Sequence, residues 1–234
     1  MTDSDPRDHR TPGLLAWAAV VLSFAAGATD AFAFLLLGGV FTANMTGNLV
    51  LAGLTERPDY AATVVGITVA IIAFAVGLLV SFRIARAAGP PSRLVTVLVL
   101  GTLAQLGVLI GWLSIPSVST MWAQAPLIAL SAFAMASQTA VSKRAESRSG
   151  VSTTYVTGTI TSLIADFSDG RPQDGLTRVA VIGALVAGAL CGALAISLDA
   201  DLGAAMPIPP AVLGTVLIWL GYRVARRRQA APQA

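Results

Sequence analysis

The sequence is poor in charge, cysteine and histidine, and each shortage excludes a class of protein. Charged residues are 12% of the 234 residues, against about 25% in a soluble domain. So few charges cannot cover the surface of a water-soluble globule. Cys191 has no second cysteine for a disulfide within the chain, and His9 is the one imidazole. Metal sites of the His/Cys type and histidine-based nucleophilic catalysis are therefore not expected.

Other signatures of chemistry are also missing. The apolar segments contain no catalytic acid–base or nucleophile–base pair, and the chain has no phosphate-binding P-loop. We therefore expect no enzyme activity, no metal and no cofactor. The net charge of +3 does not indicate a nucleic-acid-binding protein, because the basic residues stand in short clusters between apolar segments. That pattern is typical of the topology signals of a membrane protein.

Long apolar stretches dominate what is present. Hydrophobic residues are 55% of the chain, and the mean hydropathy is +0.76. A helix needs about 20 apolar residues to cross a hydrocarbon core of about 30 Å. We predict an all-α membrane protein with about six transmembrane helices, at Gly13–Leu37, Tyr60–Phe82, Leu94–Leu113, Thr120–Val141, Val179–Leu198 and Ala204–Tyr222. Three prolines, Pro207, Pro209 and Pro210, predict irregular first turns in the last helix.

The spans form one predicted membrane domain, residues 13–222, flanked by two tails. Residues 1–12 are polar and are expected to be a disordered cytoplasmic tail. Residues 223–234 begin with several arginines and are expected to be a basic cytoplasmic tail. The expected location is the inner membrane of a bacterium, with both termini in the cytoplasm.

Two further apolar segments, Thr42–Thr55 and Thr153–Asp166, are too short to cross. About 14 residues of helix reach only about 21 Å. If neither crosses and the N-terminus is cytoplasmic, fourteen of the fifteen basic residues face the cytoplasm and only Arg57 lies outside. If both cross, the division becomes nine to six. The positive-inside rule favours the first topology, which makes both segments interrupted or re-entrant.

An internal repeat relates the two short segments. A shift of 111 residues aligns Gly39–Asn48 with Gly150–Thr159 without a gap, and five of the ten positions are identical. The repeats would cover residues 13–115 and 119–222, each with three spans. Because three crossings are an odd number, the second repeat is predicted to be inverted. A 3+3 inverted repeat with interrupted segments at matching positions indicates the binding site of a transporter.

Each short segment contains a Thr-Gly pair, Thr46-Gly47 or Thr157-Gly158. We predict that the chain turns at this pair, where glycine tolerates unusual backbone angles, and returns as a half-helix of about 8 residues. Thr46, Asn48, Thr157 and Thr159 are the candidate caps. Half-helix N-termini that meet near the midplane would favour an anionic or carbonyl-bearing solute. The alternative is that these residues only permit close helix packing.

Polar side chains within the apolar segments are the other candidates. Asp30 is the one acidic residue well inside a span, and such a carboxylate is a functional candidate by default. It either exchanges protons or holds the nearby motif by hydrogen bonds. We expect a substrate-binding site that comprises Asp30, Asn44, Thr46, Gly47, Asn48, Gln138, Thr157 and Gly158. The glycine pairs Gly107/Gly111 and Gly188/Gly192 are expected to be packing contacts instead.

Three stretches carry a family resemblance: Gly27-Ala-Thr-Asp30, Phe41-Thr-Ala-Asn-Met-Thr-Gly-Asn48 and Thr153-Thr-Tyr-Val-Thr-Gly158. With them the chain resembles the YoaK-type family of bacterial membrane proteins, from about Leu14 to Arg223. The family is uncharacterised, so the resemblance implies the membrane fold and no substrate.

The features together favour a secondary transporter or permease of a small solute, with Asp30 as the candidate for proton coupling. The alternatives are a channel, or a non-transporting scaffold or sensor in a membrane complex. A membrane enzyme ranks last. The expected partners are the lipid bilayer and a small-molecule solute, with a second copy of the chain as a further candidate. Nucleic acid is not expected.

Overall fold

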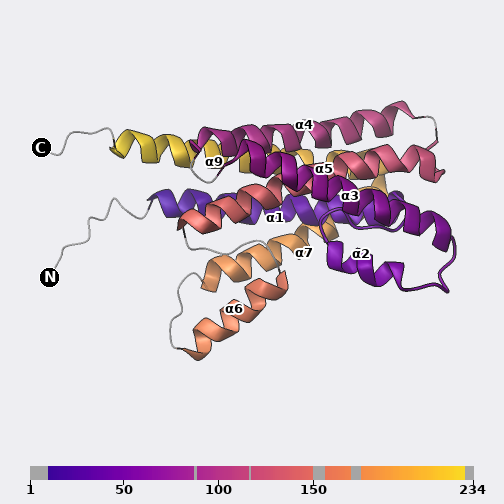
Figure 1. The fold of residues 1–234 in the computed structure, drawn as a ribbon, viewed down its shortest axis with the longest axis horizontal. Helices are drawn as coiled ribbons and strands as arrows, with labels where there is room; N and C mark the ends of the chain where they lie inside the picture. The colour runs from indigo at the N-terminus through magenta and orange to yellow at the C-terminus, as the bar shows by residue number, and fades with distance from the viewer. Residues whose placement is uncertain (1–9, 87–88, 116, 150–155, 170–174, 230–234) are drawn as a thin grey trace, which may run out of the picture.

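The fold is all-helical over the residues that the computed structural model describes, 10–86, 89–115, 117–149, 156–169 and 175–229. Those residues contain six candidate membrane spans. Five spans are single helices and the sixth is divided (Figure 1). They are α1 (Arg10–Leu36), α3 (Tyr60–Ile84), α4 (Ser92–Ser114), α5 (Met121–Ser149), α7 (Gly175–Leu198), and α8 (Ala200–Ala205) with α9 (Ile208–Gln229). The predicted all-α membrane fold is confirmed.

The ends of several helices differ from the predicted ones, and the largest extension is at the end of α5, which continues from the predicted Val141 to Ser149. Helix α1 begins at Arg10 and not at Gly13. Helix α9 continues through Gln229, so the arginines after Tyr222 are helical up to that point. The last span is interrupted between α8 and α9, where Pro207 stands. The other two prolines lie in the first turn of α9, where a missing N–H costs no intrahelical bond. Residues 1–9 of the predicted tail lie outside the described residues.

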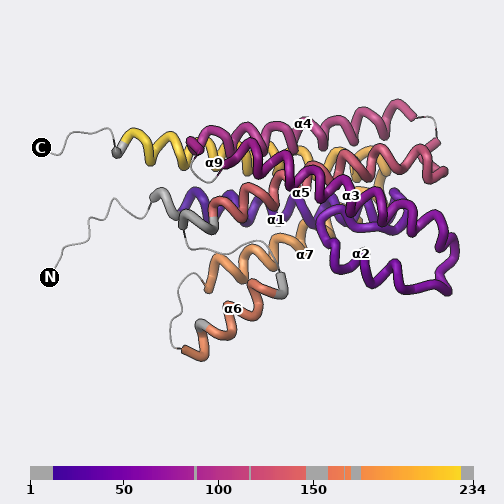
Figure 2. Tube along the Cα trace, viewed as in Figure 1, coloured from indigo at the N-terminus to yellow at the C-terminus, as the bar shows by residue number. Residues whose placement is uncertain are grey.

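The two short helices lie near opposite ends of the bundle (Figure 1). The first residues of α1 and the last residues of α9 lie at the same end, as six crossings require. The short helix α2 (Met45–Ala52) lies toward the other end, and α6 (Val156–Ser168) lies nearer the end of the termini. The colours of Figure 2 follow this path along the chain.

Helices α1 and α5 organise the packing of the other spans. Helix α1 packs against α7 and α9, whereas α5 packs against α3 and α4, and α4 also contacts α9. The outer helices leave apolar side chains uncovered, such as Ile72 (58% exposed), Leu103 (56%) and Leu194 (63%). Apolar surface on this scale is suited to lipid and not to water.

The crossing of α1 with α7 depends on glycine. A Cβ on Gly27 would collide with the carbonyl oxygen of Leu185, and a Cβ on Gly188 would collide with that of Phe24. Gly192 also approaches the backbone of α1, although less closely, because its Cβ would stand 3.1 Å from Cα of Ala28. Small residues let helix backbones approach in this way.

The second glycine pair packs α4 against α5. A Cβ on Gly107 would stand 3.4 Å from Cδ1 of Leu130, and one on Gly111 would stand 2.6 Å from Cδ2 of Leu127. Both predicted glycine pairs, in α4 and in α7, are therefore found at helix contacts.

The close contact of α1 with α7 predicts that alanine substitutions at two glycines of α7 affect stability differently. Gly188→Ala should destabilise the protein by about 1–3 kcal/mol, the usual cost of an overpacked contact. Gly183→Ala is the matched control, because nothing lies within 4 Å of its Cβ position. The midpoint of thermal unfolding in detergent should fall for Gly188→Ala and stay unchanged or rise for Gly183→Ala. Equal midpoints for the two variants would contradict the crossing.

Candidate functional site

The chain reverses direction after α1 through two glycines. Gly38 and Gly39 have φ angles of +83° and +71°, a region that side chains with a Cβ resist. The reversal returns residues 41–44 alongside α1 before α2 begins at Met45. The predicted turn at Thr46-Gly47 is therefore wrong, because both residues lie within α2.

Asp30 holds the returning segment by one of its two carboxylate oxygens. Oδ1 accepts hydrogen bonds from the backbone N–H of Thr42 (2.7 Å), from the hydroxyl of Thr42 (3.1 Å) and from the backbone N–H of Ala43 (2.8 Å). The backbone N–H of Asn44 also interacts with the carboxyl group, whereas none of the three hydrogen bonds above is made to Oδ2. The carboxylate is thus fixed mainly by one oxygen and has a second oxygen with unused acceptor capacity.

Asn48 fixes the same segment from the side of α2. Its side chain is fully buried. Its Oδ1 accepts from the backbone N–H of Phe41 (2.8 Å), and its Nδ2 donates to the backbone oxygen of the same residue (2.7 Å). A backbone segment with no helical partners is satisfied in this way, as buried backbone groups require.

The N-cap of helix α2 differs from the caps predicted from the sequence. Its N-cap is Asn44, whose Oδ1 accepts from the backbone N–H of Gly47 (3.0 Å). The expectation of caps at Thr46 and Asn48 is therefore wrong. Gly47 has another role, because a Cβ there would stand 2.8 Å from Nδ2 of Asn44 and 3.0 Å from Cδ2 of Phe41. Glycine at this position permits the close approach of the loop and is not required for an unusual backbone angle.

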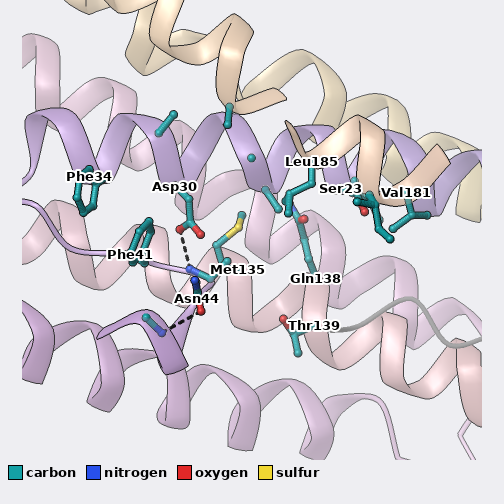
Figure 3. Close-up of a pocket in the computed structure, with 18 of the residues that line it drawn as sticks. Ser23, Asp30, Phe34, Phe41, Asn44, Met135, Gln138, Thr139, Val181 and Leu185 are labelled. Atoms are coloured by element: carbon teal, nitrogen blue, oxygen red, sulfur yellow. Dashed lines mark hydrogen bonds between the residues drawn. The ribbon is translucent and has the colours of Figure 1, made fainter. Parts of the chain in front are cut away.

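A cavity of about 1050 Å³ lies beside Asp30 (Figure 3). Its walls come from both halves of the sequence, that is from α1, the segment after it and α2, and from α5, α6 and α7. The polar or charged residues of the wall are Ser23, Asp30, Asn44, Thr46, Gln138, Thr139, Ser142 and Thr159. Ligand sites commonly combine a few polar groups with an apolar wall in this manner.

The charge of the cavity is set by a single residue. Among the described residues that line it, Asp30 is the one charged side chain, and no Lys, Arg or His is present. Phe34 and Phe41 stack with their ring centroids 4.9 Å apart, and both line the wall together with Met135. An anionic solute would therefore meet a carboxyl group and no basic side chain among the described lining residues.

The second half of the chain supplies a buried hydroxyl, that of Thr159. The side chain of Thr159, in α6, is 1% exposed and lines the cavity, and its Oγ1 has no hydrogen bond within the described part of the chain. A buried polar group without a partner is costly. The cavity is therefore lined by a carboxyl group from the first half of the chain, Asp30, and by a buried hydroxyl from the second half, Thr159.

The structure brings five of the eight predicted site residues together. Those that line the cavity are Asp30, Asn44, Thr46, Gly47 and Gln138. Asn48 is not among the described lining residues, and its side chain makes two hydrogen bonds to the backbone of Phe41. Gly158 is exposed in the first turn of α6 and is not part of the described wall. The side chain of Thr157 lies outside the described part of the structure.

Several lining residues were not selected from the sequence, although one pattern could have found them. Ser23, Gly27, Asp30 and Phe34 all line the cavity and recur at intervals of four, three and four residues. This spacing puts them on one face of a helix. The face through Asp30 could therefore have been extended in both directions along α1.

Comparison with known proteins places this architecture in a family. A family model described as a protein of unknown function, DUF1275, matches residues 18–219. The chain belongs to the DUF1275 family. It is 32% identical over 151 residues to the UPF0700 transmembrane protein YoaK of Bacillus subtilis (strain 168), an alignment that covers 63% of this chain and 65% of that protein. No solved structure matches. The chain is thus a multi-pass membrane protein of an uncharacterised family, and the resemblance to YoaK is confirmed.

The hydrogen bonds of Asp30 predict different effects for two substitutions. Asp30→Ala removes the acceptor of three bonds and leaves two N–H groups unpaired, at about 1–3 kcal/mol for each group. Asp30→Asn can keep an oxygen at the position of Oδ1. Hydrogen exchange at Thr42 and Ala43 should be much faster in Asp30→Ala and only moderately faster in Asp30→Asn, whose neutral amide oxygen is a weaker acceptor than the carboxylate. Slow exchange in both variants would show that the carboxylate does not hold the segment.

Proposed function

We propose that the chain is a secondary transporter that carries a small solute across the bacterial inner membrane through this cavity, with Asp30 as the proton-coupling group. The observation that carries the proposal is one cavity whose polar lining comes from both halves of the chain. The polar lining residues of the first half include Asp30, Asn44 and Thr46, and those of the second half include Gln138, Thr139 and Thr159. A solute bound between them would contact both halves at once.

The pairwise packing of the helices supports the inverted repeat on which this proposal depends. If α1, α3 and α4 are exchanged with α5, α7 and α9, the contact of α1 with α7 becomes that of α5 with α3. The contact of α1 with α9 becomes that of α5 with α4, and the contact of α4 with α9 becomes itself. All of these pairs are in contact. A pseudo-two-fold arrangement of this kind is typical of alternating-access transporters.

Individual residues support the same relation between the halves. The shift of 111 residues that aligns the two motifs also relates Gly77 to Gly188. Gly77 lies against Phe133 and Ala136 of α5, and Gly188 lies against Phe24 of α1. Under the same shift, residues 133–136 correspond to residues 22–25, which include Phe24. Equivalent glycines thus meet equivalent turns of the central helices.

The bonds of Asp30 suggest how proton binding would reach the rest of the protein. A carboxylate accepts hydrogen bonds more strongly than a neutral carboxyl group does. Protonation of Asp30 would therefore weaken its hold on Thr42 and Ala43, which connect through Asn44 to α2. The short helix of the first half would then be released or held according to the occupancy of the cavity.

The polar wall suits a solute with its own hydrogen-bonding groups. The amides of Asn44 and Gln138 and the hydroxyl of Thr159 can donate to a carbonyl or hydroxyl oxygen. The apolar wall of Phe34 and Met135 suits the remainder of such a molecule. The proposed topology keeps both termini in the cytoplasm, since this places fourteen of the fifteen basic residues on that side.

Reconstituted protein tests the proposal. Proteoliposomes with an imposed proton gradient should accumulate at least one member of a mixed panel of small solutes, and a protonophore should abolish the accumulation. Asp30→Asn should remove the response to the gradient, because the variant cannot exchange a proton at that position. Asp59→Asn is the matched control, since Asp59 is exposed, lies outside the spans and has a φ of +57° that Asn tolerates.

Two results would contradict the proposal. One is a wild-type protein that accumulates no solute above empty liposomes. The other is accumulation that responds to the proton gradient equally in wild type and in Asp30→Asn.

A further inference from the structure

Asp30 has no basic counter-ion among the residues that the structure describes. It makes no ion pair with a described residue, and the described wall of its cavity contains no basic side chain. A carboxylate away from bulk water is costly unless a cation or a proton neutralises it. The three bonds to Oδ1 compensate one oxygen, and Oδ2 remains open to an occupant of the cavity.

The surroundings of Oδ2 favour an organic cation over a bare metal ion. Small metal cations require several oxygen ligands, whereas Asp30 is the one carboxylate of the described wall. The rings of Phe34 and Phe41 and the thioether of Met135 offer apolar and aromatic surface instead. Aromatic faces attract ammonium-type cations and tolerate their alkyl or aryl substituents. The volume of about 1050 Å³ accommodates such a molecule.

No other described titratable group competes with Asp30 inside the cavity. On the helices packed against α1, the described ionisable side chains are Arg178 and Cys191 of α7, Lys143 and Arg144 of α5, Asp201 of α8 and those within residues 222–227 of α9. None of them lines the cavity. Among the described residues, Asp30 is therefore the group to which any pH dependence of binding in the cavity is assigned.

We propose that the solute is a lipophilic organic cation, and that its charged centre and a proton are alternative occupants of Oδ2 of Asp30. The inference rests on the transporter function proposed above and names its substrate class. Binding of one monovalent cation displaces one proton, so the charge of the cavity is the same in both loaded states. A carrier with this property exchanges the cation for a proton across the membrane.

Binding of tetraphenylphosphonium to the purified, detergent-solubilised full chain tests the inference. Wild type should bind it at neutral and alkaline pH, and the affinity should fall about tenfold for each pH unit once acid protonates Asp30. Tetraphenylborate, which has nearly the same shape and the opposite charge, should not bind in the cavity. Asp30→Asn should weaken the binding of tetraphenylphosphonium by about 100-fold or more, and Asp59→Asn should leave it unchanged.

A second measurement needs no variant. In weakly buffered solution at a pH where Asp30 is protonated, wild type should release about one proton for each tetraphenylphosphonium bound. Binding without proton release, equal binding of both tetraphenyl ions, or no binding of tetraphenylphosphonium at any pH would overturn the inference. If neutral solutes are transported in an Asp30-dependent manner while tetraphenylphosphonium does not bind, the substrate class is wrong and the transporter proposal survives.

Discussion

A single carboxylate oxygen joins the first transmembrane helix to the chain that leaves it. Oδ1 of Asp30 accepts two backbone N–H groups and one hydroxyl from Thr42 and Ala43. Non-helical backbone inside a membrane protein must be satisfied by protein groups, because lipid offers none. Asp30 and Asn48 provide these hydrogen bonds to the segment from α1 and from α2. The bonds position α2 and one wall of the cavity.

The glycine contacts determine how closely the second half approaches this wall. Gly27 and Gly188 bring the backbones of α1 and α7 together, beside the position of Asp30. Leu185, which touches Gly27, also lines the cavity. The same close crossing that stabilises the bundle therefore sets the distance between the two halves. A change of conformation that moves α7 relative to α1 would change the shape of the site directly.

The sequence predicts the fold well because hydropathy and length are local properties of each span. It predicts Asp30 as a site residue for a similar reason, since any carboxylate inside an apolar helix needs an explanation. The details of the short segment depend on contacts between distant residues. Asn44 caps α2, and Asn48 binds the backbone of Phe41, because the loop folds back along α1. That reversal begins at Gly38 and Gly39.

In the proposed mechanism, the carboxyl group of Asp30 alternates between a proton and a solute cation. Infrared difference spectroscopy observes that group directly, because protonated and ionised carboxyl groups absorb at different frequencies. Addition of tetraphenylphosphonium to wild type at acidic pH should remove a protonated-carboxyl band that Asp30→Asn lacks. A band that is unaffected by the cation, or that persists in Asp30→Asn, would contradict the account.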